Sequence, residues 1–259
     1  MYITNAFCLR GNDFLKFKKL FNYFNLTEKL IWSISVLVII VSFFVFKNDG
    51  YLTLIASLIG VTSLIFCAKG NPVGQVLMII FAVIYSIISF TFQYYGEMFT
   101  YLGMTLPMCI FSLVSWLRNP FNGKKSEVAV NKIIFKEVGF LCFLTLVVTV
   151  AFYFILKYFN TANLIPSTFS VTTSFVAAYL TFRRSPYFAL AYATNDIVLI
   201  VLWVLASINN ISYISVVICF VVFLANDLYG FISWLKMMKR QEKTIKNLLK
   251  YWHITQLEI

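Results

Sequence analysis

Two adjacent polar pairs, Asn195-Asp196 and Asn226-Asp227, each lie in the middle of a long apolar run. Among the ten acidic residues of the chain, we expect only Asp196 and Asp227 to be placed in this way. A polar or ionisable side chain in hydrocarbon is costly, so it normally faces a protein interior or a water-filled cavity. The two pairs therefore predict a central site for a polar solute.

The amide and carboxyl groups of these pairs suit particular ligands. An amide offers two donors and two acceptor positions, which suits ribose hydroxyls or a carboxamide. At about 1.5 Å per helical residue, Asn195 lies roughly 12 Å from Tyr187 and Asn226 roughly 14 Å from Leu235. We therefore expect the two amides at similar depth, facing one ligand. Carboxylates near aromatic rings favour a flat cation by cation–π attraction.

Further candidates for substrate contact share a helical face with these pairs or are polar positions in the first half of the chain. They are Phe188, Tyr192, Tyr229, Gln75, Thr105 and Cys109. Other roles stay open, because asparagines can bond neighbouring membrane helices together and the aspartates can lock helix packing. The polar groups concentrate in the second half, which predicts an asymmetric site.

Three residues are candidates for gating or interface roles. Trp116 and Trp234 lie near predicted span ends, where an aromatic belt at the membrane surface is the usual explanation and a gate is the alternative. Pro107 falls inside a predicted span and should kink it, which would make a hinge.

Other reactive chemistry is mostly absent from the sequence. There is no glycine-rich phosphate loop, and the five cysteines show neither close pairing nor metal spacing. The only histidine, His253, lies in the basic tail. We therefore expect no catalytic residues, no cofactor and no metal.

The composition indicates an all-α membrane protein. Hydrophobic residues make up 61% of the chain, charged residues 12%, and the mean hydropathy is +0.84. A span needs about 20 apolar residues to cross the hydrocarbon core. Eight runs approach this length: Leu30–Phe46, Tyr51–Ala68, Val73–Tyr94, Met98–Leu117, Val138–Leu156, Leu164–Phe182, Tyr187–Ile208 and Ser212–Leu235. Short connections predict one helical bundle.

The basic residues predict the orientation of the bundle. With eight spans, every Lys and Arg except Lys47 and Lys157 falls on one side. The positive-inside rule makes that side cytoplasmic, so both termini of a multi-pass inner (plasma) membrane protein are predicted in the cytoplasm. The net charge of +11 is therefore explained by basic residues at the membrane surface, and it does not indicate binding of nucleic acid. The basic tail, 237–259, is expected to form an amphipathic helix on anionic lipid, or to regulate.

An internal repeat organises the spans. Lys69–Pro72 resembles Arg183–Pro186, and Ser115–Leu117 corresponds to Ser233–Leu235. The repeats are residues 51–118 and 164–236. Because three spans invert the chain, one linker span, 138–156, must restore its direction. This gives a 3+1+3 arrangement with an extra helix at 30–46 after a cytoplasmic segment, 1–29. Parallel repeats are a known transporter plan with a midplane site between them.

At this point the sequence resembles the PnuC family of vitamin transporters over roughly residues 50–240. The resemblance rests on Asn195–Leu199, Asn226–Gly230 with Trp234, Tyr95–Glu97, and Leu106–Met108 with Trp116. It implies a fold like that of the SWEET sugar transporters and facilitated diffusion of nicotinamide riboside by alternating access. It also implies trapping of the riboside by phosphorylation inside the cell. Family members are often trimers, so a homotrimer is among the expected assemblies.

The chain departs from the family in one motif. Asn195 matches the asparagine that closes the family's Trp-x-x-Trp-x-x-x-Asn pattern, but Phe188 and Ala191 stand where the tryptophans would be. Relatives within the family carry thiamine or riboflavin, so another vitamin is the alternative substrate. More remote alternatives are a membrane-embedded enzyme built on the two aspartates and a non-transporting receptor.

Overall fold

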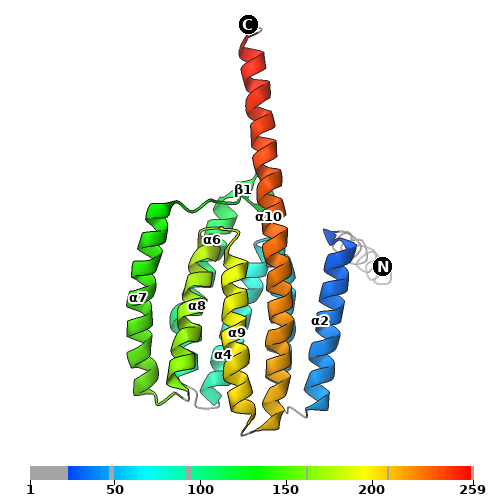
Figure 1. Ribbon diagram of the computed structural model, residues 1–259. Coiled ribbons are helices and arrows are strands. Elements are labelled where there is room, and N and C mark those ends of the chain that lie inside the picture. Colours follow the sequence, from blue (N-terminus) through cyan, green and yellow to red (C-terminus); the bar gives the residue numbers. More distant parts are fainter. Residues whose placement is uncertain (1–22, 47–49, 92–94, 162, 209, 258–259) are drawn as a thin grey trace, which may run out of the picture.

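The computed structural model describes residues 23–46, 50–91, 95–161, 163–208 and 210–257. Within these segments, eight helical stretches are long and apolar enough to cross a membrane, and they stand side by side in one bundle (Figure 1). The helices are α2 (Leu26–Val45), α3 (Tyr51–Ala68), α4 (Val73–Thr91), α5 (Tyr95–Thr100), η1 (Tyr101–Thr105), α6 (Leu106–Arg118), α7 (Phe135–Tyr158), α8 (Leu164–Phe182), α9 (Phe188–Ser207), η2 (Ile211–Tyr213) and α10 (Ile214–Leu257). The predicted all-helical membrane class is confirmed, with α5, η1 and α6 together forming the fourth span.

Local hydrogen bonds explain where helices begin and how they tolerate polar residues. Asn25 and Glu28 form a reciprocal capping box, with both side chain-to-backbone bonds at 2.8 Å, so α2 begins before the predicted Leu30. Inside the spans, hydroxyls such as those of Ser57 and Ser86 donate to the carbonyl four residues earlier. The polar hydrogens are thus satisfied within the helix.

The fourth span changes helix type in its middle. Tyr101–Thr105 forms a π-helical turn, and Pro107 stands in the first turn of α6 directly after it. Proline lacks an N–H, and its ring clashes with the carbonyl four residues earlier. A wider turn relieves this clash. The sequence predicts a kink at Pro107, and the structure has a π-helical turn directly before it. Such turns are a recognised cause of helix kinks.

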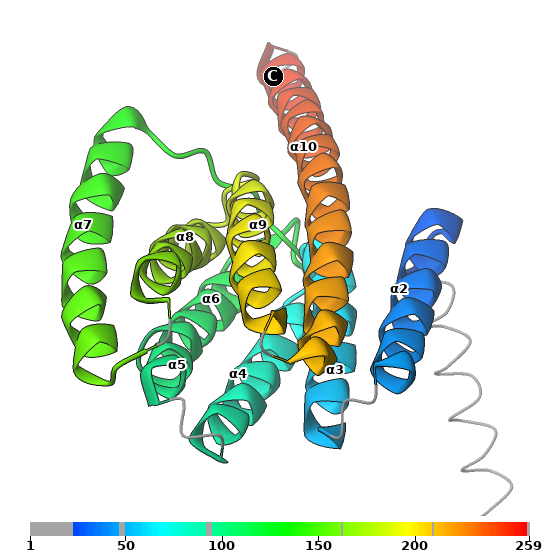
Figure 2. The same ribbon diagram turned by 60° about the horizontal axis from the view of Figure 1, so that its bottom comes forward.

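The helices pack in a regular order. In the first half α3 packs against α4 and α4 against α6, and in the second half α8 packs against α9 and α9 against α10. Between the halves α3 packs against α10, and α6 against α8. At the two edges of the bundle lie α7, against α8, and α2, against α3 and α10 (Figure 2).

Two equivalent loops at one end of the bundle are joined by a single strap. Gly70 and Arg184 both have left-handed backbones, with φ of 66° and 57°. The residue after each donates its N–H to the carbonyl five residues earlier, at 3.1 and 3.0 Å, which is a common helix C-cap. Val128 then donates its N–H to the carbonyl of Gly70, and Asn131 donates to that of Arg184, both at 3.0 Å. We call residues 119–131 the strap.

The strap contains a short hairpin that the sequence analysis did not predict. Strand β1 (Pro120–Phe121) pairs antiparallel with β2 (Lys124–Val128). Asn122 and Gly123 form its turn with φ of 49° and 74°. Asn-Gly is the favoured sequence for a two-residue turn with both residues at positive φ, so the signal was present.

The tail is helical, as predicted, but it continues α10 without a break and projects beyond the bundle (Figure 1). Gln241 fixes its base, because Nε2 donates to the carbonyl of Val128 at 3.0 Å and Oε1 accepts from the N–H of Val130 at 2.9 Å. These bonds hold the described part of the tail in line with α10. This differs from the expected helix lying along the membrane surface.

Candidate functional site

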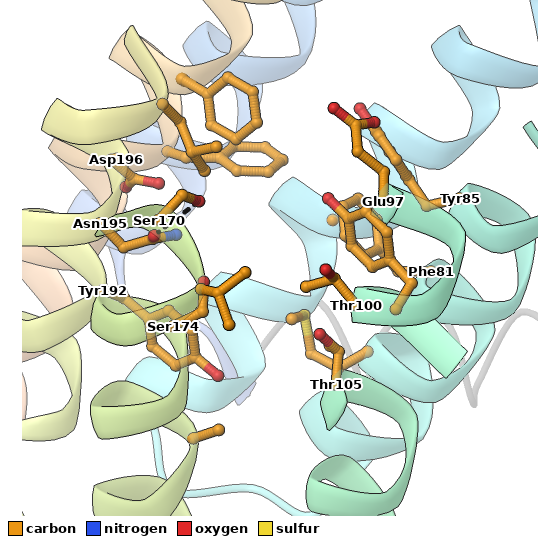
Figure 3. A pocket seen from close by; sticks show the side chains of 18 of the residues that line it. Phe81, Tyr85, Glu97, Thr100, Thr105, Ser170, Ser174, Tyr192, Asn195 and Asp196 are labelled. Atoms are coloured by element: carbon orange, nitrogen blue, oxygen red, sulfur yellow. Dashed lines mark hydrogen bonds between the residues drawn. The ribbon is translucent and has the colours of Figure 1, made fainter. Parts of the chain in front are cut away.

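A cavity of about 140 Å³ lies inside the bundle between its two halves. Its walls come mainly from α3, α4, α5 and η1 on one side and from α8, α9 and α10 on the other, with Leu156 contributed by α7 (Figure 3). The acidic and amide residues that line it are Gln75, Glu97, Asn195, Asp196 and Asp227. No Lys, Arg or His is among the described residues of the lining. The chamber is therefore aromatic, polar and acidic.

Asn195 is oriented by hydroxyls on the neighbouring helix. Its Oδ1 accepts hydrogen bonds from Thr173 Oγ1 at 2.8 Å and Ser170 Oγ at 3.3 Å, both from α8. Figure 3 shows the amide on the cavity wall beside Ser170. Because its oxygen is engaged by α8, the Nδ2 protons are the part of the amide that can serve a ligand.

Asp196 and Asp227 form a buried pair across α9 and α10. Their side chains are only 4% and 5% exposed, and their carboxyl groups lie close enough to share a hydrogen bond. Two carboxyl groups this close repel each other when both are ionised. Asp196 Oδ2 is buried without a hydrogen-bond partner among the described residues. Asp196 Oδ2 can therefore accept a hydrogen bond from a polar ligand.

The cavity brings together most of the residues predicted from sequence. Its lining includes Asn195, Asp196, Asp227, Tyr192, Phe188, Gln75 and Thr105. It does not include Asn226, Tyr229 or Cys109. Cys109 is buried in α6, at 4% exposure, and no α6 residue borders the cavity.

Asn226 and Tyr229 face the extra first helix. Asn226 Nδ2 donates to Ser35 Oγ of α2 at 2.9 Å, and the Tyr229 hydroxyl donates to Glu28 at 3.4 Å. Adjacent helical residues point about 100° apart, so Asp227 can face the cavity while Asn226 cannot. The expectation that both amides face one ligand in this cavity is thus corrected.

The two tryptophans pack against each other in the interior of the protein. Trp116 and Trp234 are 1% and 0% exposed, and their ring centroids lie 5.4 Å apart. Their Nε1 atoms donate to the carbonyls of Thr181 and Cys67, at 2.9 and 2.8 Å. Phe188 packs edge-on against Trp234 at 4.9 Å and also lines the cavity. Because both rings lie in the protein interior, the interpretation as a lipid-facing aromatic belt is wrong.

Glu97 is the main residue that the sequence analysis missed. The fourth apolar run was expected to begin at Met98, but the span begins at Tyr95 and includes Glu97. Glu97 lines the cavity together with Tyr85 and Tyr101. Asp196 and Asp227 are therefore not the only acids within spans. The spacing of four between Glu97 and Tyr101, which places both on one helix face, was a signal that could have identified it.

The comparisons with known proteins agree on one family. The model described as "Nicotinamide mononucleotide transporter" matches residues 50–236. A relative, nicotinamide riboside transporter PnuC of Neisseria mucosa, is 25% identical over 214 residues, 81% of each chain. The crystal structure of the vitamin B3 transporter PnuC has a TM-score of 0.72 and 24% identity, covering 84% of this chain and 94% of that one, and shows a common fold. With eight apolar helices and a family match over most of its length, this chain belongs to the PnuC family of membrane transporters.

Proposed function

We propose that the protein takes up nicotinamide riboside across the inner membrane by facilitated diffusion. The observation that carries this proposal is the acidic, aromatic cavity between the two halves of the bundle, whose described lining has no basic side chain. A pyridinium riboside supplies a flat cation for the rings and carboxyl groups, together with hydroxyls and a carboxamide for the amides. The name of the Neisseria mucosa relative supports the same substrate.

Each polar wall of the cavity has a role in this proposal. Asn195, held by α8, donates its Nδ2 protons to the ribose or the carboxamide. Asp196 and Asp227 bond to hydroxyls. Tyr192 and Phe188 supply ring surfaces at the places nearest the missing tryptophans, and Gln75 and Thr105 are the polar contacts from the first half of the chain. Asn226, Tyr229 and Cys109 lie outside the lining of the cavity and have no contact with the ligand in this proposal.

The mononucleotide fits this cavity poorly. Its phosphate would enter a chamber that holds Glu97, Asp196 and Asp227 and no described basic residue. Transfer of a phosphate from water to such a site is unfavourable because nothing there compensates its charge. Phosphorylation of the riboside inside the cell would therefore trap it, since the product could not leave by the same route.

Alternating access in this proposal relies on two parallel three-helix repeats. The units are α3 to α6 and α8 to α10, with α7 as the linker and α2 as the additional helix. The packing supports this plan, because the first helix of each unit contacts the third helix of the other. The matching loops at Gly70 and Arg184 and the matching tryptophan bonds support it further. Repeats related in this way can rock about a fixed midplane site.

The proposed orientation places the strap and the tail in the cytoplasm. Lys69, Arg183 and Arg240 lie at this end, linked to Glu28, Glu137 and Glu127 respectively. Lys157 lies in the last turn of α7, at the other end of that helix from the strap. The charge difference between the two ends supports cytoplasmic termini under the positive-inside rule.

Calorimetric titration of the purified protein with four ligands tests the proposed substrate. We expect nicotinamide riboside to bind far more tightly than nicotinamide mononucleotide, thiamine or riboflavin. Equal affinity for riboside and mononucleotide would refute the charge argument. Tight binding of thiamine or riboflavin alone would assign another vitamin to the same fold.

A further inference from the structure

We propose that Glu97 and the rings of Phe81, Tyr85 and Tyr101 form a subsite that recognises the positive charge of the ligand. This inference rests on the proposed function and deepens it. The subsite accepts an organic cation with delocalised charge, such as a pyridinium ring. It lies in the first half of the chain, opposite the amide and carboxyl pair of the second half.

The three rings form one continuous cluster on α4 and η1. The ring centroids of Phe81 and Tyr85 lie 4.6 Å apart, those of Tyr85 and Tyr101 5.1 Å apart, and those of Phe81 and Tyr101 6.3 Å apart. All three residues line the cavity. A cluster of aromatic faces attracts a cation through the ring quadrupoles, and such cages are a common way to bind quaternary ammonium groups.

Glu97 adds a carboxyl group to this cluster. It lies one helical turn before Tyr101 and interacts electrostatically with the hydroxyl groups of both Tyr85 and Tyr101. Figure 3 shows Glu97 beside Tyr85, across the cavity from Asp196 and Asn195. An acid and several rings that converge on one space are what a flat cation requires, whereas a neutral sugar gains little from them.

The two acidic regions of the cavity differ in a way that separates their roles. Asp196 and Asp227 are in contact and can reduce their charge by sharing a proton. Among the described residues Glu97 has no such carboxyl partner, and no basic side chain lines the cavity to neutralise it. A cationic ligand should therefore interact more favourably with Glu97 than with the aspartate pair.

Together the two walls define an orientation for the ligand. The charged ring points toward Glu97 and the tyrosines, and the hydroxyl-bearing part points toward Asn195 and the aspartate pair. Charge and hydrogen bonding are thus recognised by different halves of the bundle. Substitution of Glu97 should consequently alter discrimination by charge and leave the recognition of the sugar intact.

A pair of ligands that differ in ring charge tests this assignment. Nicotinamide riboside is cationic, and its reduced dihydro form has the same sugar and carboxamide on a neutral ring. For Glu97→Gln we expect affinity for the cation to fall roughly tenfold or more, with affinity for the neutral form changed by less than about twofold. Glu97→Asp should restore part of the preference for the cation. Glu242→Gln, which removes an acid from the exposed tail, is the control and should change neither affinity.

The outcomes separate this inference from the proposed function. Equal losses for the two ligands would assign Glu97 a structural role, and an unchanged preference for the cation would place charge recognition elsewhere; either result overturns the inference alone. Failure of the wild-type protein to bind nicotinamide riboside would overturn the proposed function as well. If Glu97→Gln does not fold, Tyr101→Leu decides, since loss of one ring should weaken binding of the cation more than binding of the neutral form.

Discussion

Asn195 and Asn226 have the same side chain and are each followed by aspartate, but they meet different neighbours. Asn195 borders the cavity and is held by hydroxyls of α8. Asn226 bonds to Ser35 of α2. The sequence could indicate that both residues lie within spans, where polar groups need partners. It could not indicate which direction each residue faces, because this depends on how α2 and α9 pack around α10.

Substitution of the two asparagines should therefore have different effects. Asn195→Leu should weaken riboside binding by about 1–3 kcal/mol, the usual cost of a lost partner in a desolvated site. Asn226→Leu should leave affinity unchanged and lower thermal stability by about 1 kcal/mol, since it removes the bond to Ser35. Calorimetry and thermal unfolding in detergent measure the two effects. A loss of affinity in Asn226→Leu equal to that in Asn195→Leu would mean that both amides meet the ligand.

At the scale of elements, the number of spans and some of their limits were predictable, whereas the contacts between connections were not. Tyr51–Ala68 and Leu164–Phe182 have the same limits in the sequence analysis and in the structure, because continuous apolar runs mark membrane helices directly. The hairpin of the strap was not predicted, although its Asn122-Gly123 turn is a recognisable local signal. Its bonds to Gly70, Arg184 and Gln241 join residues distant in sequence, and no local pattern indicates them.

The π-helical turn before Pro107 should act as a hinge in the fourth span. In Pro107→Ala the restored N–H allows regular α-helical bonding, which removes the reason for the wider turn. We expect riboside exchange in liposomes to slow several-fold, while equilibrium affinity measured by calorimetry stays within about twofold. Unchanged exchange would show that the turn is a fixed feature of the fold. Val114→Ala is the control for loss of side-chain volume, because Val114 is an exposed residue on the same span.

The indole bonds of the tryptophan pair should contribute to stability. Trp234→Phe keeps an aromatic ring in place but leaves the carbonyl of Cys67 without its Nε1 donor. The carbonyl still accepts from the N–H of Gly70, so the loss is that of one hydrogen bond, about 0.5–1.5 kcal/mol, and we expect a lower thermal unfolding temperature. Trp116→Phe, which removes the equivalent bond to Thr181, should give a similar loss. Very different losses would argue against an equivalent role for the two positions.

At the scale of the whole molecule, energy coupling is the main open prediction. Among the described acids within the spans, Glu97, Asp196 and Asp227 line the cavity, whereas Glu28 and Glu137 lie in the first turns of α2 and α7. His253 lies in the tail, so no continuous chain of acids and histidines crosses the bundle in its described part. We expect uptake into liposomes to follow the riboside gradient alone. An imposed sodium or proton gradient should leave the initial rate unchanged, and a strict requirement for either gradient would contradict simple facilitated diffusion.

The homotrimer implied by the family resemblance is likewise a whole-molecule proposal. Along α7, large apolar side chains such as Phe140, Phe143 and Phe154 are exposed on the isolated chain, where either lipid or another copy could cover them. We expect a native mass measurement in mild detergent to give three copies. A mass of one chain with full riboside binding would show that the site functions in the monomer.

The continuous α10 helix has a mechanical consequence. Its 44 residues extend over roughly 66 Å, about twice the thickness of the hydrocarbon core. The same rigid rod therefore carries Asp227 at the cavity and ends well outside the bundle. A tilt of about 10° at the membrane would sweep its far end through on the order of 5 Å, so a small movement around the ligand would be larger at the end of the tail. A fluorophore attached near its end would report each such tilt during transport.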